Sequence, residues 1–128
     1  MTETLKLAVN GTLMRGLALN PNLTNVGATF DCETTTEPAY RLWTISDRYP
    51  AMMRVAAGGA AIAVEIWNVP LAGLGAILMQ EPPGLAIGKV KLANGETVLG
   101  VIGEPLTVKG QREITQFGGW RAYQASLD

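Results

Sequence analysis

The chain of 128 residues contains no histidine, a single cysteine and only two serines, Ser46 and Ser126. The missing histidine excludes the Ser-His-Asp and Cys-His arrangements of nucleophilic catalysis and removes the most common zinc ligand. Because Cys32 is the only thiol, a tetrahedral thiolate site and an internal disulfide are excluded as well. No glycine motif for binding phosphates or dinucleotides is present. Any chemistry must therefore depend on carboxylates, an arginine, a tyrosine or backbone amides, and we expect no metal ion and no cofactor.

The chain also lacks clustered positive charge and long apolar runs. Ten basic and eleven acidic residues give a net charge of −1, and the basic residues are scattered singly. A surface that follows nucleic-acid phosphates needs clustered Lys and Arg, and a membrane span needs roughly 20 apolar residues. The N-terminal "MTETLK" lacks the basic segment followed by an apolar segment that is typical of a signal peptide. We therefore expect no nucleic-acid partner, no membrane contact and a cytoplasmic location.

Apolar side chains are abundant instead. They make up 48% of the sequence, against 16% charged residues, which is typical of a folded protein. The length suits one domain with its own core, and no linker, repeat or low-complexity block interrupts it, so we expect a single domain over residues 1–128. Because the apolar share is high for a monomer, it also favours a buried subunit interface, and we expect a homodimer.

Three segments have the composition of strands: Leu5–Val9, "TFDCETTT" (Thr29–Thr36) and "YRLWTIS" (Tyr40–Ser46). Between the first two, Asn20 and Pro21 predict the N-cap and first residue of a short helix. Further on, Gly58-Gly59 between two apolar runs predicts one hairpin, and Asn94-Gly95 predicts another with a type I′ turn.

The apolar run after Gly59 alternates Ile62, Val64 and Ile66 with Ala63, Glu65 and Trp67, so a carboxylate and an indole share one face of a strand. A buried carboxylate needs a partner, and we expect Glu65 to pair with Arg41 or Arg54; the alternative is a catalytic role for Glu65.

Helical patterns are short. Pro70 predicts the start of a helix that continues to about Gln80, with Leu71, Leu74, Ile77 and Leu78 on its buried stripe. "EITQFGGWRAYQ" predicts a turn and a short helix that packs Trp120 and Tyr123. In total we expect about seven strands and two or three short helices. Consecutive hairpins favour an α+β protein with a mostly antiparallel curled sheet or small barrel.

Several segments occur in the same order as in a known family: "RGLALN" (Arg15–Asn20), "YRLW" (Tyr40–Trp43), "GGAAIAVEIW" (Gly58–Trp67), "LAIGKVKLANGETVLG" (Leu85–Gly100) and "ITQFGGWRAY" (Ile114–Tyr123). They resemble the C-terminal domain of allophanate hydrolase, a relative of the γ-glutamylcyclotransferase fold. The resemblance implies a γ-glutamylcyclotransferase-like fold. It also implies that the protein acts together with a separate amidase in urea or allophanate nitrogen metabolism.

The resemblance implies two different activities, which depend on the loop after the first strand. The likeness to allophanate hydrolase implies that the domain helps to decarboxylate the carboxylated product of the amidase, through a histidine in a Gly-x-His-Leu loop. Alignment on "GLALN" places Leu13 at the position of that histidine. The γ-glutamylcyclotransferases have Tyr-Gly-Ser/Thr-Leu-x-x-Gly, which "NGTLMRG" matches except that Asn10 replaces the tyrosine. Their Leu-Asp-x-x-Glu-Gly segment resembles "ILMQEP", in which Glu81 takes the place of the acid and Leu78 that of the aspartate.

Glu81 is the candidate catalytic residue. It could move a proton as a general acid or base if burial raises its pKa toward neutrality; the alternative is a solvated acid at a helix end. Gly11, Thr12 and Leu13 could offer successive N–H groups to a carboxylate, and the alternative is an ordinary strand exit. The candidate substrate-binding residues are Asn10, Gly11, Thr12, Leu13, Arg15, Tyr40 and Arg41.

Arg15 and Arg41 are included because a guanidinium matches the two oxygens of a carboxylate, although both could instead be solvated or pair with surface acids. Tyr40 could equally be a core aromatic residue. These residues leave three functions open. The chain could bind a small carboxylated or urea-type molecule beside a separate amidase. It could be a γ-glutamylcyclotransferase-type cyclising enzyme, or a non-catalytic assembly domain for an amidase. An enzyme requires Glu81 in a pocket with the loop amides, whereas an assembly domain requires a filled pocket and an apolar interface.

Overall fold

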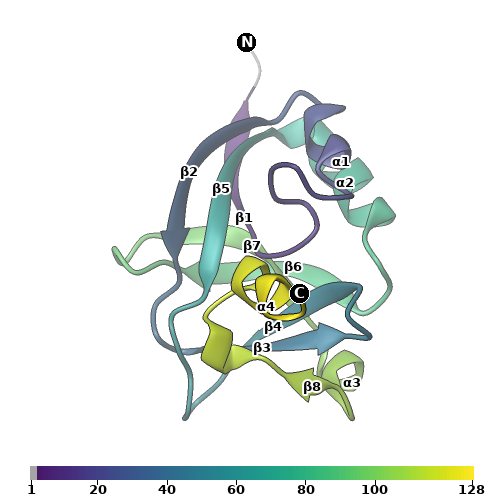
Figure 1. Cartoon of the computed structure of the whole chain (residues 1–128). Helices are drawn as coiled ribbons and strands as arrows, with labels where there is room; N and C mark the ends of the chain where they lie inside the picture. Colours follow the sequence, from purple (N-terminus) through teal and green to yellow (C-terminus); the bar gives the residue numbers. More distant parts are fainter. Residues whose placement is uncertain (1–2) are drawn as a thin grey trace.

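The computed structural model describes residues 3–128 and contains two curved β-sheets and several short helices (Figure 1). The larger sheet has the strand order β2-β5-β1-β7-β6 and the smaller sheet the order β4-β3-β8. Neighbouring strands run antiparallel except β1 and β7, which run parallel. The strands are β1 (Thr4–Val9), β2 (Thr29–Thr35), β3 (Tyr40–Ile45), β4 (Tyr49–Arg54), β5 (Ala63–Pro70), β6 (Leu85–Lys91), β7 (Thr97–Gly103) and β8 (Arg112–Glu113). This architecture confirms the α+β class and the mostly antiparallel, curled sheet.

The helices are all short, and α1 and α2 lie side by side at one end of the molecule (Figure 1). Within residues 3–128, no helix is long and apolar enough to cross a membrane. The α-helices are α1 (Pro21–Thr24), α2 (Leu74–Gln80), α3 (Pro105–Val108) and α4 (Trp120–Ser126), and the 3-10 helices are η1 (Leu71–Gly73) and η2 (Thr115–Phe117).

One apolar core joins the two sheets and the C-terminal helix. Leu7 of β1, Ile66 of β5, Leu42 of β3 and Tyr123 of α4 belong to the same cluster of buried side chains. Each is at most 2% exposed. The C-terminal turn and helix predicted around Trp120 and Tyr123 are therefore confirmed.

The hairpin predicted at Gly58-Gly59 is wrong. The apolar runs on either side belong to different sheets, because β4 pairs with β3 while β5 pairs with β1 and β2. The two glycines serve the crossing between the sheets. Gly58 has a φ of +74°, and a Cβ at Gly59 would lie 2.6 Å from the carbonyl carbon of Ala39.

The hairpin predicted at Asn94-Gly95 is confirmed, since it joins β6 to β7, but its turn is not type I′. Of the two residues only Gly95 has a positive φ, of 89°. Its N–H donates to Leu92 O, and Leu92 N–H donates to Glu96 O, which is the pattern of a three-residue loop with a glycine bulge. Two successive positive φ values occur instead at Ser46 and Asp47, in the turn between β3 and β4.

The helix predicted from Pro70 begins later. Pro70 ends β5, and η1 precedes α2, so the apolar stripe is broken. Ile77 is fully buried, whereas Leu71 is 53% and Leu78 38% exposed. Strand pairing with β1 continues through Pro70, so the helical segment begins at Leu71 with η1 and continues as α2 to Gln80.

Candidate functional site

The loop between β1 and α1 is fixed at both ends by asparagine side chains (Figure 1, purple). Asn10 is buried, and its Nδ2 donates a hydrogen bond of 3.0 Å to Val101 O on β7. Asn20 was expected to cap α1, but its side chain makes no capping bond. Its Nδ2 donates instead to Leu13 O at 2.8 Å. The two amides hold residues 10–13 in place against the sheet and the helix.

The first residues of this loop approach β4 very closely. A Cβ at Gly11 would lie 2.4 Å from Cδ of Pro50, so only glycine fits without displacement. The N–H groups of Gly11, Thr12 and Leu13 donate no hydrogen bond to any acceptor in residues 3–128. These three donors are available to a ligand oxygen, as a backbone anion site requires.

Glu81 follows the last turn of α2, where its backbone N–H still donates to Leu78 O at 3.2 Å. Its carboxylate is half-buried and forms no ion pair or hydrogen bond with the described residues. Burial disfavours the charged form and raises the pKa of Glu81 from the ordinary 4.5 to about 7. At neutral pH this group can therefore either donate or accept a proton.

Glu81 and the first loop meet at one small cavity. Its volume of about 10 Å³ accommodates a single water molecule or one ligand oxygen. Four of the residues predicted to bind substrate line it together with Glu81, namely Asn10, Gly11, Thr12 and Leu13. The remaining lining residues are Val9, Tyr49, Pro50, Leu85 and Val101.

A larger groove lies outside this cavity and shares Thr12, Tyr49 and Glu81 with its lining. The groove has a volume of about 560 Å³, which is the size of a small-molecule site. Sequence analysis missed Tyr49 and its neighbour Arg48, which also lines the groove. No local motif marks them, because they reach the site only through the turn from β3 to β4.

Three predicted binding residues lie outside the lining of the cavity and the groove. Arg15 pairs with Glu33 and Glu65. Tyr40 is buried in the core, and its hydroxyl accepts a hydrogen bond of 3.2 Å from Lys91 N–H. Arg41 donates through Nε to Gly58 O at 3.1 Å.

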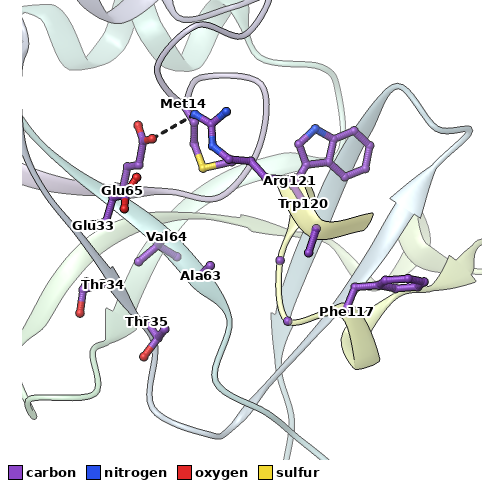
Figure 2. A pocket seen from close by; sticks show the side chains of 13 residues that line it. Met14, Glu33, Thr34, Thr35, Ala63, Val64, Glu65, Phe117, Trp120 and Arg121 are labelled. Carbon is purple, nitrogen blue, oxygen red and sulfur yellow. Dashed lines mark hydrogen bonds and ion pairs between the residues drawn. The ribbon is translucent and has the colours of Figure 1, made fainter. Parts of the chain in front are cut away.

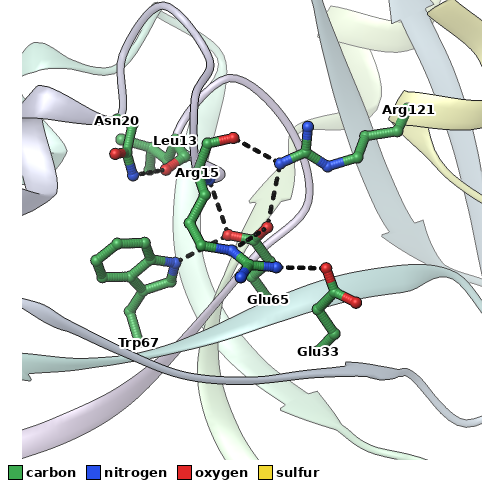
Figure 3. Close-up of polar contacts among 7 residues, drawn as sticks. All are labelled: Leu13, Arg15, Asn20, Glu33, Glu65, Trp67 and Arg121. Carbon is green, nitrogen blue, oxygen red and sulfur yellow. Dashed lines mark hydrogen bonds and ion pairs between the residues drawn. The ribbon is translucent and has the colours of Figure 1, made fainter. Parts of the chain in front are cut away.

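Glu65 is the centre of a buried polar network that holds the far part of the same loop (Figure 3). The carboxylate is 2% exposed and accepts hydrogen bonds from Arg15 N–H at 2.9 Å and from Trp67 Nε1 at 3.1 Å. The guanidinium groups of Arg15 and Arg121 also donate to it, at 3.3 and 3.2 Å. Arg121 in addition donates to Arg15 O at 2.6 Å, which ties α4 to the loop.

The charge of Glu65 is stabilised by these donors. Burial alone would raise its pKa, but the hydrogen bonds from Arg15, Trp67 and Arg121 outweigh burial and hold the pKa below its ordinary range. The expectation of a structural pairing for Glu65 is confirmed. The prediction that Arg41 or Arg54 is the partner is wrong. Both arginines lie on strands of the smaller sheet, where Arg41 pairs with Glu113 and Arg54 with Glu37.

Next to this network is a second cavity of about 410 Å³ (Figure 2). Thr34 and Thr35 lie on one side of it, and Phe117 and Trp120 on the other. Its only charged lining residues are Glu33, Glu65 and Arg121, and all three are already paired. In the part of the chain that the structure describes, no group of three or more Cys, Asp or Glu side chains is spaced to hold a metal ion.

The two curled, mostly antiparallel sheets with their short helices form a γ-glutamylcyclotransferase-like fold. The family model of the allophanate hydrolase C-terminal domain matches residues 5–125, and the chain belongs to this family. The sequence-based resemblance is thereby confirmed.

Two relatives carry this domain within much longer chains. Urea amidolyase of Saccharomyces cerevisiae is 37% identical over 95% of this chain, which spans only 7% of that protein. An allophanate hydrolase structure from Kluyveromyces lactis is 32% identical, with a TM-score of 0.91 over 98% of this chain and 22% of its own. The matching segment is thus a small part of each of these larger proteins.

A solved structure of similar size also matches. A uropathogenic E. coli-specific protein is 58% identical, with a TM-score of 0.95 over 98% of both chains. An AIG2-like protein from Mus musculus is 18% identical, with a TM-score of 0.61 over 82% of this chain and 79% of its own, and shows the fold alone.

Proposed function

We propose that this chain binds a small carboxylated or urea-type molecule in the groove at Glu81 and places one ligand oxygen in the small cavity. It would act beside a separate amidase in urea or allophanate nitrogen metabolism. One observation carries this proposal. Within residues 3–128, the half-buried Glu81 carboxylate has no partner, and it lines the same one-oxygen cavity as Gly11, Thr12 and Leu13, whose backbone N–H groups have no acceptor there.

The two sides of the cavity support complementary roles. The N–H groups of Gly11, Thr12 and Leu13 stabilise negative charge on a ligand oxygen without any charged side chain. Glu81, when protonated, donates a hydrogen bond to an anionic oxygen, and when ionised it accepts a proton. If the chain catalyses a cyclotransferase-type reaction, Glu81 takes the proton of the attacking amine and gives it to the leaving amine.

A histidine-dependent decarboxylation is not supported by the side chain at that position. Leu13 is 2% exposed and carries no proton to exchange. Assistance to such a reaction would have to come from Glu81 and the loop amides.

Thermal-shift measurements with malonate, glutamate and 5-oxoproline test the proposal. A specific acid raises the melting temperature with the logarithm of its concentration. We expect Gly11→Val to abolish this gain, and Glu81→Gln to remove its dependence on pH near neutrality. Glu104→Gln, at an exposed acid outside the lining of both cavities, is the matched control and should bind as the wild type does. The proposal fails if no acid stabilises the wild type, or if all three variants respond alike.

An assembly role for an amidase is the second candidate. It is favoured by relatives in which this domain is a small part of a longer chain, and by exposed apolar side chains on η1 and α2. These are Leu71, Leu78 and Met79. In this hypothesis a cytoplasmic homodimer holds the amidase through an interface of at least about 1,000 Å². Light scattering of the chain alone and mixed with an amidase tests it, and Met79→Lys should weaken the association.

A further inference from the structure

The groove outside the cavity has two charged residues in its lining, and they come from different segments of the chain. Glu81 belongs to the segment after α2, and Arg48 to the turn between β3 and β4. No ion pair joins them. The groove that both residues line has a volume of about 560 Å³, which leaves room for a small molecule.

Arg48 differs from the other arginines of the described chain. Its side chain is exposed and has no hydrogen bond or ion pair with residues 3–128. Every other arginine has a partner: Arg15 and Arg121 contact Glu65, Arg41 contacts Glu113, Arg54 contacts Glu37, and Arg112 lies over the ring of Tyr123. The guanidinium of Arg48 is thus the one whose donors remain free at a cavity.

The backbone that carries Arg48 is held firmly. Ser46 and Asp47 have φ values of 54° and 58°, which cost free energy for residues other than glycine. The turn is closed by Arg48 N–H, which donates to Ile45 O at 3.0 Å. The Asp47 carboxylate accepts hydrogen bonds from Thr44 Oγ1 at 3.1 Å and from the Tyr123 hydroxyl at 2.5 Å. These contacts tie the turn to the C-terminal helix and fix the backbone position of Arg48 at the lining of the groove.

We propose that Arg48 binds a second acidic group of the ligand, at the end away from the cavity, and that the site therefore selects small dicarboxylates over monoacids of the same length. The proposal rests on the proposed function, because it needs a ligand whose first oxygen enters the cavity at Glu81. A guanidinium forms two parallel hydrogen bonds with a carboxylate, whereas a neutral amide cannot accept both in the same way. Arg48 is a specificity-determining residue in this assignment.

Calorimetric titration of the 128-residue chain with matched pairs tests the assignment. The probes are malonate against malonamate and succinate against succinamate, in which the second carboxylate is replaced by an amide. We expect the wild type to prefer the diacid of one pair by about tenfold or more, as a charge-assisted hydrogen bond implies. Arg48→Gln should bind the diacid and the monoamide equally, and Arg48→Lys should keep part of the preference.

Arg54→Gln is the matched control, because it removes one positive charge from an exposed arginine outside the groove. A loss of diacid affinity that is equal in Arg48→Gln and Arg54→Gln would overturn the assignment. So would a wild type that binds diacid and monoamide equally. If the wild type binds diacid and monoamide equally and this binding still depends on Gly11 and Glu81, the proposed function stands and only the assignment of Arg48 falls. If the wild type binds no acid at all, both proposals are overturned.

Discussion

Gly11 and Pro50 lie so close that a Cβ on Gly11 would be 2.4 Å from Cδ and 2.7 Å from Cγ of the proline ring. The contact brings the loop after β1 directly against β4. Both residues line the small cavity at Glu81, so the same contact sets the position of the loop amides in the site.

Gly11→Ala should therefore destabilise the protein and weaken acid binding together. The added methyl group forces Pro50 or the loop to move, and overpacking of this kind costs about 1–3 kcal/mol. Denaturant unfolding measures the loss of stability, and calorimetric titration with malonate measures the loss of binding.

Gly75→Ala is the matched control for this substitution. Gly75 lies in α2, is exposed, and has no atom within 4 Å of an added Cβ. Alanine favours a helix, so this variant should gain about 0.5–1 kcal/mol of stability and bind malonate unchanged. An equal effect of the two substitutions would contradict a special role for the contact with Pro50.

The raised pKa of Glu81 predicts a pH-dependent stability. The carboxyl group has a pKa of about 7 in the folded protein and near 4.5 when unfolded, so the folded state binds the proton more tightly. Stability is then lost as pH rises between these two values, because the buried carboxylate must ionise. Relative to the wild type, Glu81→Gln should gain at most about 3 kcal/mol between acid and mildly alkaline pH.

Urea unfolding at several pH values checks this prediction. The difference between Glu81→Gln and the wild type should be small below about pH 5 and largest above about pH 8. A flat difference for Glu81→Gln would show that its carboxyl group is solvated, as in the alternative reading of a helix end.

Removal of the Glu65 carboxylate should unfold part of the network that holds the loop. Glu65→Gln leaves Arg15 and Arg121 facing an amide that cannot accept all their hydrogen bonds, and the loss of stability should be about 3 kcal/mol. Because the pKa of Glu65 lies below its ordinary range, the stabilisation is present at neutral pH and disappears as pH falls. Chemical denaturation of the variant and the wild type at neutral and acid pH measures both effects.

Glu33→Gln is the control for the network. Glu33 is exposed and pairs only with the outer side of Arg15, so this variant should lose less than about 1 kcal/mol. A similar loss of unfolding free energy in Glu33→Gln and Glu65→Gln would mean that the burial of Glu65 does not strengthen its contribution to stability.

The hydrogen bond between Tyr123 and Asp47 should be necessary for the turn that carries Arg48. The Asp47 carboxylate raises the pKa of the Tyr123 hydroxyl, because the hydrogen bond favours the protonated phenol. Tyr123→Phe should lower the melting temperature by roughly 3–8 °C and reduce the preference for a diacid. Tyr40→Phe also removes a buried hydroxyl and should lower the melting temperature, but it should leave ligand preference unchanged.

Much of the fold was predictable from local patterns. Strand composition identified β1, β2 and β3, and the family segments in their order implied the γ-glutamylcyclotransferase-like fold. The pairing of "NGTLMRG" with Glu81 came from the same resemblance, and the structure places both at one cavity. The predictions of the fold and the family are confirmed, because they depend on short segments whose residues carry the information themselves; the role of the loop and Glu81 as a binding site stays a prediction.

Other features depend on contacts between distant segments. Asn94-Gly95 has the composition of a type I′ turn, yet the two positive φ values are at Ser46 and Asp47, where Thr44 and Tyr123 bind the aspartate. Gly58-Gly59 looks like a hairpin, but the chain crosses there between two sheets. Local propensity is worth only a fraction of the free energy that tertiary packing contributes, so packing decides such cases.

The sequence by itself determined the residue types available for chemistry, since a chain without histidine is left with carboxylates, an arginine, a tyrosine or backbone amides. The family resemblance also predicted that the loop after β1 and Glu81 belong to one site, and both line the same cavity. Only the tertiary structure decided which arginine faces the groove. Arg15 and Arg41 are held by other parts of the chain, whereas Arg48 remains free, because pairing of guanidinium groups depends on where distant carboxylates and carbonyl groups come to lie after folding.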